Sequence, residues 1–134
     1  MRIFVGIDPG FNGAIVFIDE DRNIIKKSVT PIFKSTLAKN QYNLVEMVKL
    51  LEEFKDGIKL ASLEKTQAFK LQGLSSTHSI GRGGGLWEGI LAGLHIPYQI
   101  VAPKQWQKVI FEGLNYDDTK QASIMIAQRL CPKE

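Results

Sequence analysis

The stretch VGIDPGFNGAIVFIDE, residues 5–20, governs how the rest of the sequence is interpreted. An apolar run that begins at Ile3 ends on an acid, Asp8, and the chain then breaks at once with Pro9-Gly10. Such a run is typical of a buried central strand, and the glycines and asparagine after it are typical of a tight turn. A second apolar run, residues 14–18, follows. We therefore expect two antiparallel strands with a carboxylate at the tip of the first.

The composition is that of an ordinary globular protein of one domain. The chain has 134 residues, of which 44% are hydrophobic and 23% are charged. No apolar run approaches the roughly 20 residues of a membrane helix, and the N-terminus lacks the order of a signal peptide. A single cysteine, Cys131, excludes an intrachain disulfide and fits a reducing compartment. We therefore expect a cytoplasmic protein without a membrane partner.

The formal net charge of +3 favours a polyanionic partner. The lysines are scattered along the chain, however, and a solvated basic surface explains such a charge equally well. Charge alone therefore does not identify the partner.

Hydrophobic periodicity predicts an α/β fold in one domain, residues 1–134. Three strands joined by short turns come first, and helices then alternate with two further strands. We expect a mixed five-stranded sheet, with three antiparallel strands followed by parallel strands, flanked by helices. The expected strands are 3–7, 14–18, 23–29, 58–63 and 96–101, and the expected helices begin near Asn43, Pro103 and Asp118.

Residues 75–93 are ambiguous. Their second half has the apolar spacing of a helix, but five glycines lie between Gly81 and Gly89. Each glycine costs about 1 kcal/mol relative to alanine in a helix, so propensity alone predicts a loop for the first part. Trp87 and Trp106 lie among apolar neighbours, which favours core packing for both.

Two strands of this pattern each end in an acid, Asp8 and Glu64. If the two strands are neighbours, both carboxylates emerge at the same edge of the sheet. Two carboxylates held close repel each other, and a divalent cation relieves that repulsion. Magnesium accepts a few carboxylates together with water and phosphate oxygens, which suits phosphodiester chemistry. The alternative is that each acid is simply a solvated strand end.

The motif GIDPG, the following NGAIVFID, and ASLEKTQ at residues 61–67 together resemble the RuvC-type Holliday junction resolvases of the RNase H-like nuclease superfamily. IPYQIVAPKQWQK, residues 96–108, resembles the strand and short helix of that family, and DDTKQAS, residues 117–123, resembles the start of its last helices. The similarity is greater to the short phage-type members than to the cellular enzyme. It implies an RNase H-like sheet.

The resemblance also implies site residues. Asp8 and Glu64 match the first two metal-binding carboxylates of the family, and Lys120 matches a lysine near the scissile phosphate. The implied cofactor is Mg²⁺ or Mn²⁺. The glycine-rich stretch matches a helix that lies over the active site and helps to form a homodimer, with Gly81, Gly85 and Gly89 on one face.

The family carries two further acids on a last helix, and this sequence stops before such a pattern. Asp117 and Asp118 lie too early and are explained by capping of the preceding helix. We therefore expect the chain to lack its last helix and half of the metal site, which would leave this truncated chain inactive as a nuclease.

Basic residues near the acids are candidates for DNA contacts. Lys65, Phe69 and Lys70 lie close together after Glu64, and the aromatic ring could stack on an unpaired base. Core packing is the alternative for Phe69. Lys104 and Lys108 are candidates for phosphate contacts, with a solvated face as the alternative.

The sequence thus favours a dimeric, magnesium-dependent endonuclease that cuts Holliday junctions and other branched DNA, in recombination, repair or phage DNA processing. If the gene is phage-borne, the protein acts in the bacterial host cell. A dimer that binds branched DNA without cutting it is the alternative. An ATP-binding protein of the actin and sugar-kinase type is a third possibility, but those proteins need two such domains and this chain has room for one.

Overall fold

A five-stranded mixed sheet forms the centre of the protein. The computed structural model describes residues 1–34, 39–67 and 73–132. The strands run in the order β3-β2-β1-β6-β7, with antiparallel pairing from β3 to β1 and parallel pairing from β1 to β7. The bounds are β1 Ile3–Asp8, β2 Ala14–Asp19, β3 Ile24–Val29, β6 Ile58–Glu64 and β7 Tyr98–Val101. The α/β fold predicted from the sequence is therefore confirmed.

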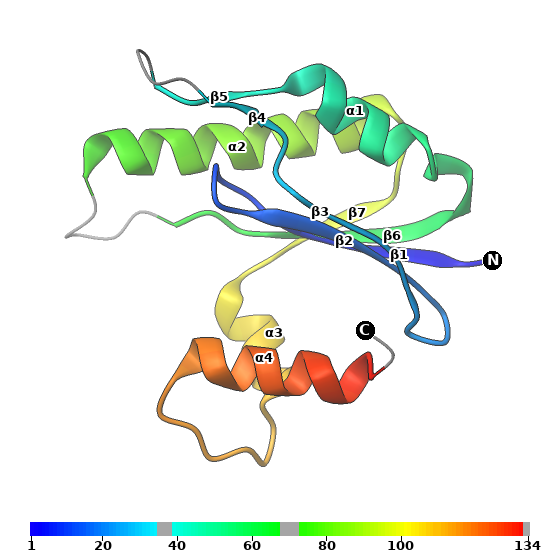
Figure 1. The fold of residues 1–134 in the computed structure, drawn as a ribbon, viewed down its shortest axis with the longest axis vertical. Helices are drawn as coiled ribbons and strands as arrows, with labels where there is room; N and C mark the ends of the chain where they lie inside the picture. The colour runs from blue at the N-terminus through cyan, green and yellow to red at the C-terminus, as the bar shows by residue number, and fades with distance from the viewer. Residues whose placement is uncertain (35–38, 68–72, 133–134) are drawn as a thin grey trace.

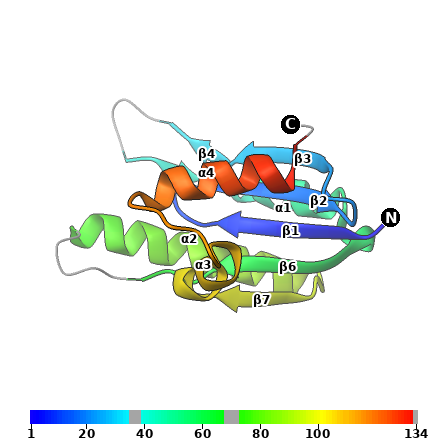
Figure 2. The ribbon, with the colours of Figure 1, turned by 90° about the horizontal axis from the view of Figure 1, so that it is seen from below.

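Helices lie on both sides of this sheet, as Figure 1 shows. Helices α1 (Leu44–Glu52) and α2 (Leu74–Gly93) cover one face. Helices α3 (Pro103–Ile110) and α4 (Thr119–Leu130) lie on the other side, and Figure 2 shows them in front of the strands. A short 3-10 turn, η1 (Lys55–Gly57), leads into β6. Within the described residues, no helix is long and apolar enough to cross a membrane.

The core lies between the sheet and the α1–α2 layer. Alternate residues of β1, namely Ile3, Val5 and Ile7, are buried on that face. They pack in one cluster with side chains of the two helices, among them Met47, Leu51, Trp87 and Leu91. The intervening residues of β1 point to the opposite face because successive side chains of a strand alternate. Asp8 therefore projects from the face that α1 and α2 do not cover.

Helix α2 is continuous through its glycines. The loop predicted from propensity is wrong, and the helix implied by the family resemblance is confirmed. The reason is close packing: a Cβ at Gly83 would collide with the Tyr42 hydroxyl, and one at Gly84 would lie 2.8 Å from Cγ2 of Thr66. Packing against Tyr42 of β5 and against Thr66, which follows β6, therefore offsets the conformational cost of the glycines.

Several boundaries differ from the sequence prediction. Strand β7 begins at Tyr98 rather than Ile96, because the Ile96 amide donates to the Leu91 carbonyl in the turn after α2. A small hairpin, β4 (Ile32–Phe33) with β5 (Gln41–Tyr42), was not predicted, since strands of two residues carry no readable periodicity. The caps at Asn43 and Asp118 are confirmed, each accepting backbone N–H groups of its own helix.

Candidate functional site

The turn after β1 holds Asp8 in place. Gly10 has a φ of +111°, a conformation that favours glycine, and the Gly13 amide donates to the Gly10 carbonyl over 3.1 Å. A Cβ at Gly13 would collide with the carbonyl oxygen of Asp8. Only glycine fits there, so the sequence GFNG builds a tight turn directly against the backbone of the acid.

Glu64 ends the strand beside β1. Strands β1 and β6 pair in parallel, and Ile7 lies opposite Leu63 in the register. Both strands therefore end in their acid at the same edge of the sheet. The expected adjacency of the two strands is confirmed, and the Asp8 carboxylate lies close enough for its charge to act on Glu64.

Both acids are disfavoured as anions by their surroundings. Burial of the carboxyl group raises the pKa of Asp8, although the residue as a whole is exposed. Burial is also the main cause that raises the pKa of Glu64; a hydrogen bond from Trp106 opposes it, and the charge of Asp8 adds to it. The pair therefore concentrates negative charge in a site where water compensates it only in part.

Trp106 supplies a hydrogen bond that sequence analysis missed. Its indole Nε1 donates to Oε2 of Glu64 over 3.1 Å, and its ring packs edge-on against Phe111 with 5.6 Å between centroids. The expectation that Trp106 is a core residue is therefore wrong, whereas Trp87 is fully buried as expected. One signal in the sequence could have indicated this hydrogen bond: Trp106 lies in the first turn of the helix that follows the strand beside β6. A half-buried indole N–H at that position needs an acceptor.

Two hollows meet at the acid pair. The larger, which we call the sheet groove, has a volume of about 660 Å³ and lies between α3 and the face of the sheet opposite to α1 and α2. Besides the acids it is lined by Gln99, Trp106 and Val109, among others. The smaller hollow, of about 180 Å³, is lined by Asp8, Glu64, Lys65, Thr66 and Ile80, among others. Polymer or solvent can thus reach the carboxylates from both sides of the strand ends.

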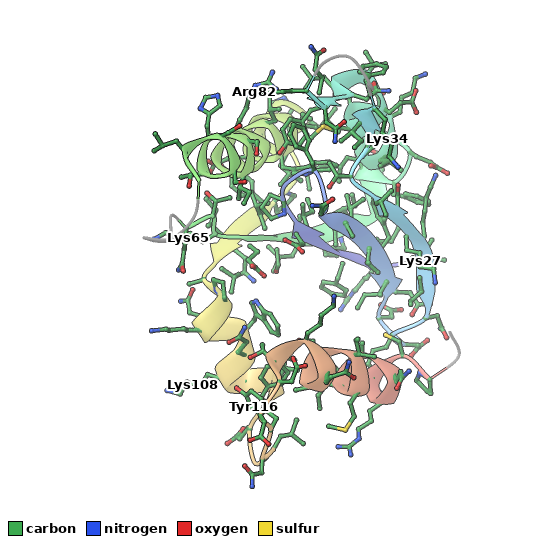
Figure 3. All side chains as sticks on the ribbon, turned by 60° about the vertical axis from the view of Figure 1, so that its left-hand side comes forward. Lys27, Lys34, Lys65, Arg82, Lys108 and Tyr116 are labelled. Atoms are coloured by element: carbon green, nitrogen blue, oxygen red, sulfur yellow. The ribbon has the colours of Figure 1, made fainter. Side chains whose placement is uncertain are left out.

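The lysines predicted for the site are distributed unevenly. Lys65 is exposed and lines the smaller hollow beside the acids. Lys104 and Lys108 are exposed on α3, and Figure 3 shows Lys65 and Lys108 on the same side of the molecule. Lys120 is exposed in the first turn of α4 and lines neither hollow. The predicted contacts of Phe69 and Lys70 lie outside the described residues.

The donor set at the acid pair fits a divalent cation. Magnesium is commonly bound through one or two carboxylates, with water and substrate phosphate completing its shell. Asp8 and Glu64 provide those two carboxylates, and a cation would offset both the burial and the neighbouring charge of Asp8 that raise the pKa of Glu64. No group of three or more His, Cys, Asp or Glu side chains able to hold a metal occurs within residues 1–34, 39–67 and 73–132.

Comparisons with known proteins identify the fold. No protein-family model and no curated protein matches the sequence. Among solved structures, T. thermophilus RuvC in complex with a Holliday junction substrate superimposes with a TM-score of 0.73 over 98% of this chain. The chain has the RuvC fold. A second Thermus thermophilus RuvC structure gives a TM-score of 0.71 over the same share.

The likeness to RuvC is one of structure rather than sequence. The identities are 11% and 12%, and in each case the matched region covers 81% of the RuvC chain. At such identity the match establishes the fold alone. The resemblance expected from the GIDPG motif is confirmed at that level, and the roles of individual residues rest on the geometry described above.

Proposed function

We propose that this protein is a metal-dependent, structure-specific endonuclease that hydrolyses phosphodiester bonds in Holliday junctions and other branched DNA. The observation that carries the proposal is the pairing of Asp8 and Glu64 at the ends of neighbouring parallel strands, β1 and β6, in a RuvC fold. The T. thermophilus RuvC with this fold is in complex with a Holliday junction substrate, which supports branched DNA as the substrate class.

The residues of the chain take distinct roles in this proposal. Asp8 and Glu64 would hold Mg²⁺ or Mn²⁺, and the bound cation would supply an activated water and compensate charge on the phosphate and the leaving 3′ oxygen. Trp106 keeps Glu64 oriented through its hydrogen bond. Lys65, beside both acids, binds the neighbouring phosphate.

Other predicted DNA contacts remain part of the proposal. Lys104 and Lys108 bind backbone phosphates from the exposed surface of α3, and Lys120 approaches the scissile phosphate from α4. Phe69, with Lys70, enters the junction centre and stacks on a base.

A homodimer would place two such sites on one junction. Helix α2 carries two kinds of glycine: Gly83 and Gly84 are buried against the sheet, whereas Gly81, Gly85 and Gly89 are exposed with open space around them. Nothing within the described chain uses this exposed glycine row. We propose that it lets a second copy of α2 approach closely, so that two sites related by a two-fold axis cut two strands symmetrically.

A dimer that binds branched DNA without cutting is the second candidate. It is favoured by one observation: within the described residues no third His, Cys, Asp or Glu joins Asp8 and Glu64 in a metal-binding group. The two candidates share their DNA contacts and differ only in catalysis.

The test compares cutting and binding in the same proteins. Asp8→Asn and Glu64→Gln remove a carboxylate charge with little change of shape, and Asp56→Asn is the matched control because Asp56 is an exposed acid of η1 at the opposite end of β6. Cleavage of a synthetic four-way junction is measured with Mg²⁺, and binding is measured in EDTA.

Loss of a ligand should lower cleavage by more than about 100-fold, since even residues that only orient a ligand cost about 10–100-fold. Junction affinity should persist or rise, because one negative charge facing the DNA is gone. The control should behave as wild type. The wild type is tested together with any further residues that its gene encodes. If that protein binds junctions but cuts none, the non-cutting alternative replaces the nuclease.

A further inference from the structure

A third hollow, separate from the two at the acid pair, lies on the other side of the Gly10 turn. Its volume is about 640 Å³, and it is formed by the turn after β1, the segment leading into β5, and the first turns of α2. We call it the α2 hollow. It is lined by Phe11, Lys39, Asn40, Tyr42, Ser75, Ser76, His78, Ser79 and Arg82.

The lining of the α2 hollow is rich in hydrogen-bond donors and cations. Lys39 and Arg82 carry positive charge, and the Ser75 and Ser76 hydroxyls, the His78 ring and the Asn40 amide add further donors. The Ser79 hydroxyl already donates to the Ser76 carbonyl over 3.0 Å. No aspartate or glutamate is among the described residues that line it. This combination matches the oxygens of a phosphate group, which accept hydrogen bonds and carry negative charge.

The donors are attached to a rigid support. Tyr42 is only 5% exposed, and its hydroxyl donates to the carbonyl of Ser79 over 2.6 Å. Its ring stacks on Phe11 at 4.4 Å between centroids and lies 5.7 Å from the Arg82 guanidinium. Lys39 Nζ donates to Ser75 Oγ over 3.3 Å. The cationic side chains are therefore partly organised before any ligand binds.

The arrangement is elongated rather than point-like. Ser75, His78, Ser79 and Arg82 follow the spacing of a single helix face, and the row spans about 10 Å at 1.5 Å rise per residue. The row is longer than one phosphate group, so it can contact more than one phosphate of a strand. It suits consecutive phosphates better than a single small anion.

The α2 hollow is also near the acid pair. Phe11 follows Asp8 by three residues, which limits the separation of their Cα atoms to about 11 Å. Helix α2 separates the two sites: Ile80 lines the small hollow with the acids, while its neighbour Ser79 lines the α2 hollow. Figure 3 shows Arg82 on α2 and Lys65 nearer to the end of β6.

We propose that the α2 hollow binds the phosphodiester backbone of the strand that passes through the acid pair, close to the scissile phosphate. This inference rests on the proposed function and assigns Lys39 and Arg82 as the principal phosphate contacts. A free phosphate or nucleotide shares the same chemistry, so the test must separate that source from a continuous strand.

The test is the salt dependence of DNA binding by the whole chain in EDTA. The variant is Lys39→Gln with Arg82→Gln. The matched control is Lys55→Gln with Lys59→Gln, which removes two exposed cations near the start of β6, at the end opposite Glu64. Binding of a fluorescent four-way junction and of a single strand is followed by anisotropy between about 50 and 200 mM salt. Circular dichroism melting establishes that each protein is folded.

Each lost phosphate contact should reduce the slope of log K against log salt by about 0.9 on a duplex or 0.7 on a single strand. The variant should therefore lose about 1.4–1.8 in slope relative to the control. Lys39→Gln combined with Arg82→Lys, which keeps the charge at position 82, should show only about half of that loss. An unchanged slope in the folded variant overturns the inference while leaving the nuclease proposal intact.

Two further arms distinguish the remaining outcomes. If inorganic phosphate raises the melting temperature of the wild type but not of the variant, and the DNA slopes are equal, the hollow is a site for free phosphate and the inference is wrong. If the wild type binds no DNA under any condition, the inference and the proposed function fail together.

Discussion

Replacing Trp106 by phenylalanine removes one donor from Glu64 and keeps an aromatic ring at the position. The bond that is lost joins Nε1 to Oε2 over 3.1 Å, and the packing that is kept is the edge-on contact with Phe111. A hydrogen bond to a charged group contributes about 1.5–3 kcal/mol. Because Glu64 is half-buried, water replaces part of the loss, and we expect the carboxylate to be destabilised by about 1 kcal/mol.

The direction in which Trp106→Phe shifts the pH dependence of cleavage follows from the form of Glu64 that the hydrogen bond stabilises. The indole N–H bonds the ionised carboxylate and so lowers the pKa of Glu64; its removal raises that pKa. At a pH on the acidic limb of the cleavage profile, about 1 kcal/mol corresponds to roughly fivefold less ionised Glu64. The acidic limb should therefore move to higher pH, while the rate at high pH changes little.

The assay has a readout that does not depend on activity. The carboxyl carbon of Glu64 is titrated by NMR in the metal-free protein, and the cleavage profile is recorded in parallel. Trp87→Phe is the control, because Trp87 is fully buried and its Nε1 has no hydrogen-bond partner among the described residues. If Glu64 titrates at the same pH in wild type and Trp106→Phe, the hydrogen bond does not tune the acid and the reasoning is refuted.

Three further changes test the site and its support. Ionising Glu64 costs the folded state more than the unfolded state, since burial raises its pKa. The unfolding free energy of the wild type should therefore fall relative to Glu64→Gln as pH rises above the ordinary pKa of a glutamate, and a constant gap in urea titrations without metal would show that this is wrong. Gly13→Ala drives a Cβ into the Asp8 carbonyl and should cost about 1–3 kcal/mol in denaturant unfolding; wild-type stability would contradict the turn geometry. Gly83→Ala should destabilise the fold in thermal melts, whereas Gly85→Ala should raise monomer stability by about 1 kcal/mol and weaken a dimer in sedimentation; equal effects would remove the distinction between buried and exposed glycines.

The strands and their terminal acids could be predicted because the signal is local. A continuous apolar run that ends in Asp8 or Glu64 defines both the strand and the place of its carboxylate. The sequence order alone does not place β6 beside β1, since β2, β3, the hairpin β4–β5, α1 and η1 intervene along the chain. The hypothesis of a shared metal site therefore required β1 and β6 to be neighbours, and the pairing of Ile7 with Leu63 shows that they are.

What could not be predicted depends on contacts between distant segments. Helix α2 forms against its local propensity because Gly83 fits under Tyr42, a residue 41 positions earlier in the chain. Trp106 donates a hydrogen bond to Glu64 and does not pack in the core, because α3 lies beside the strand that ends in Glu64. The α2 hollow likewise joins Lys39 to Ser75 and Arg82, and no spacing rule relates those residues in the sequence.

The Gly10 turn links the two sites mechanically. Asp8, one member of the acid pair, precedes this turn, and Phe11 lies within it and lines the α2 hollow. Gly83 packs so closely against the turn that a Cβ there would lie 3.1 Å from the Gly10 amide nitrogen. A strand held in the α2 hollow would therefore be fixed relative to the same backbone that carries Asp8. Binding energy gained away from the reacting bond can then orient the scissile phosphate, which raises the rate of the chemical step as well as affinity. If the proposed function holds, the α2 hollow and the acid pair would therefore act together: positive charge would hold the strand, and the carboxylates would bind the cation needed to cut it.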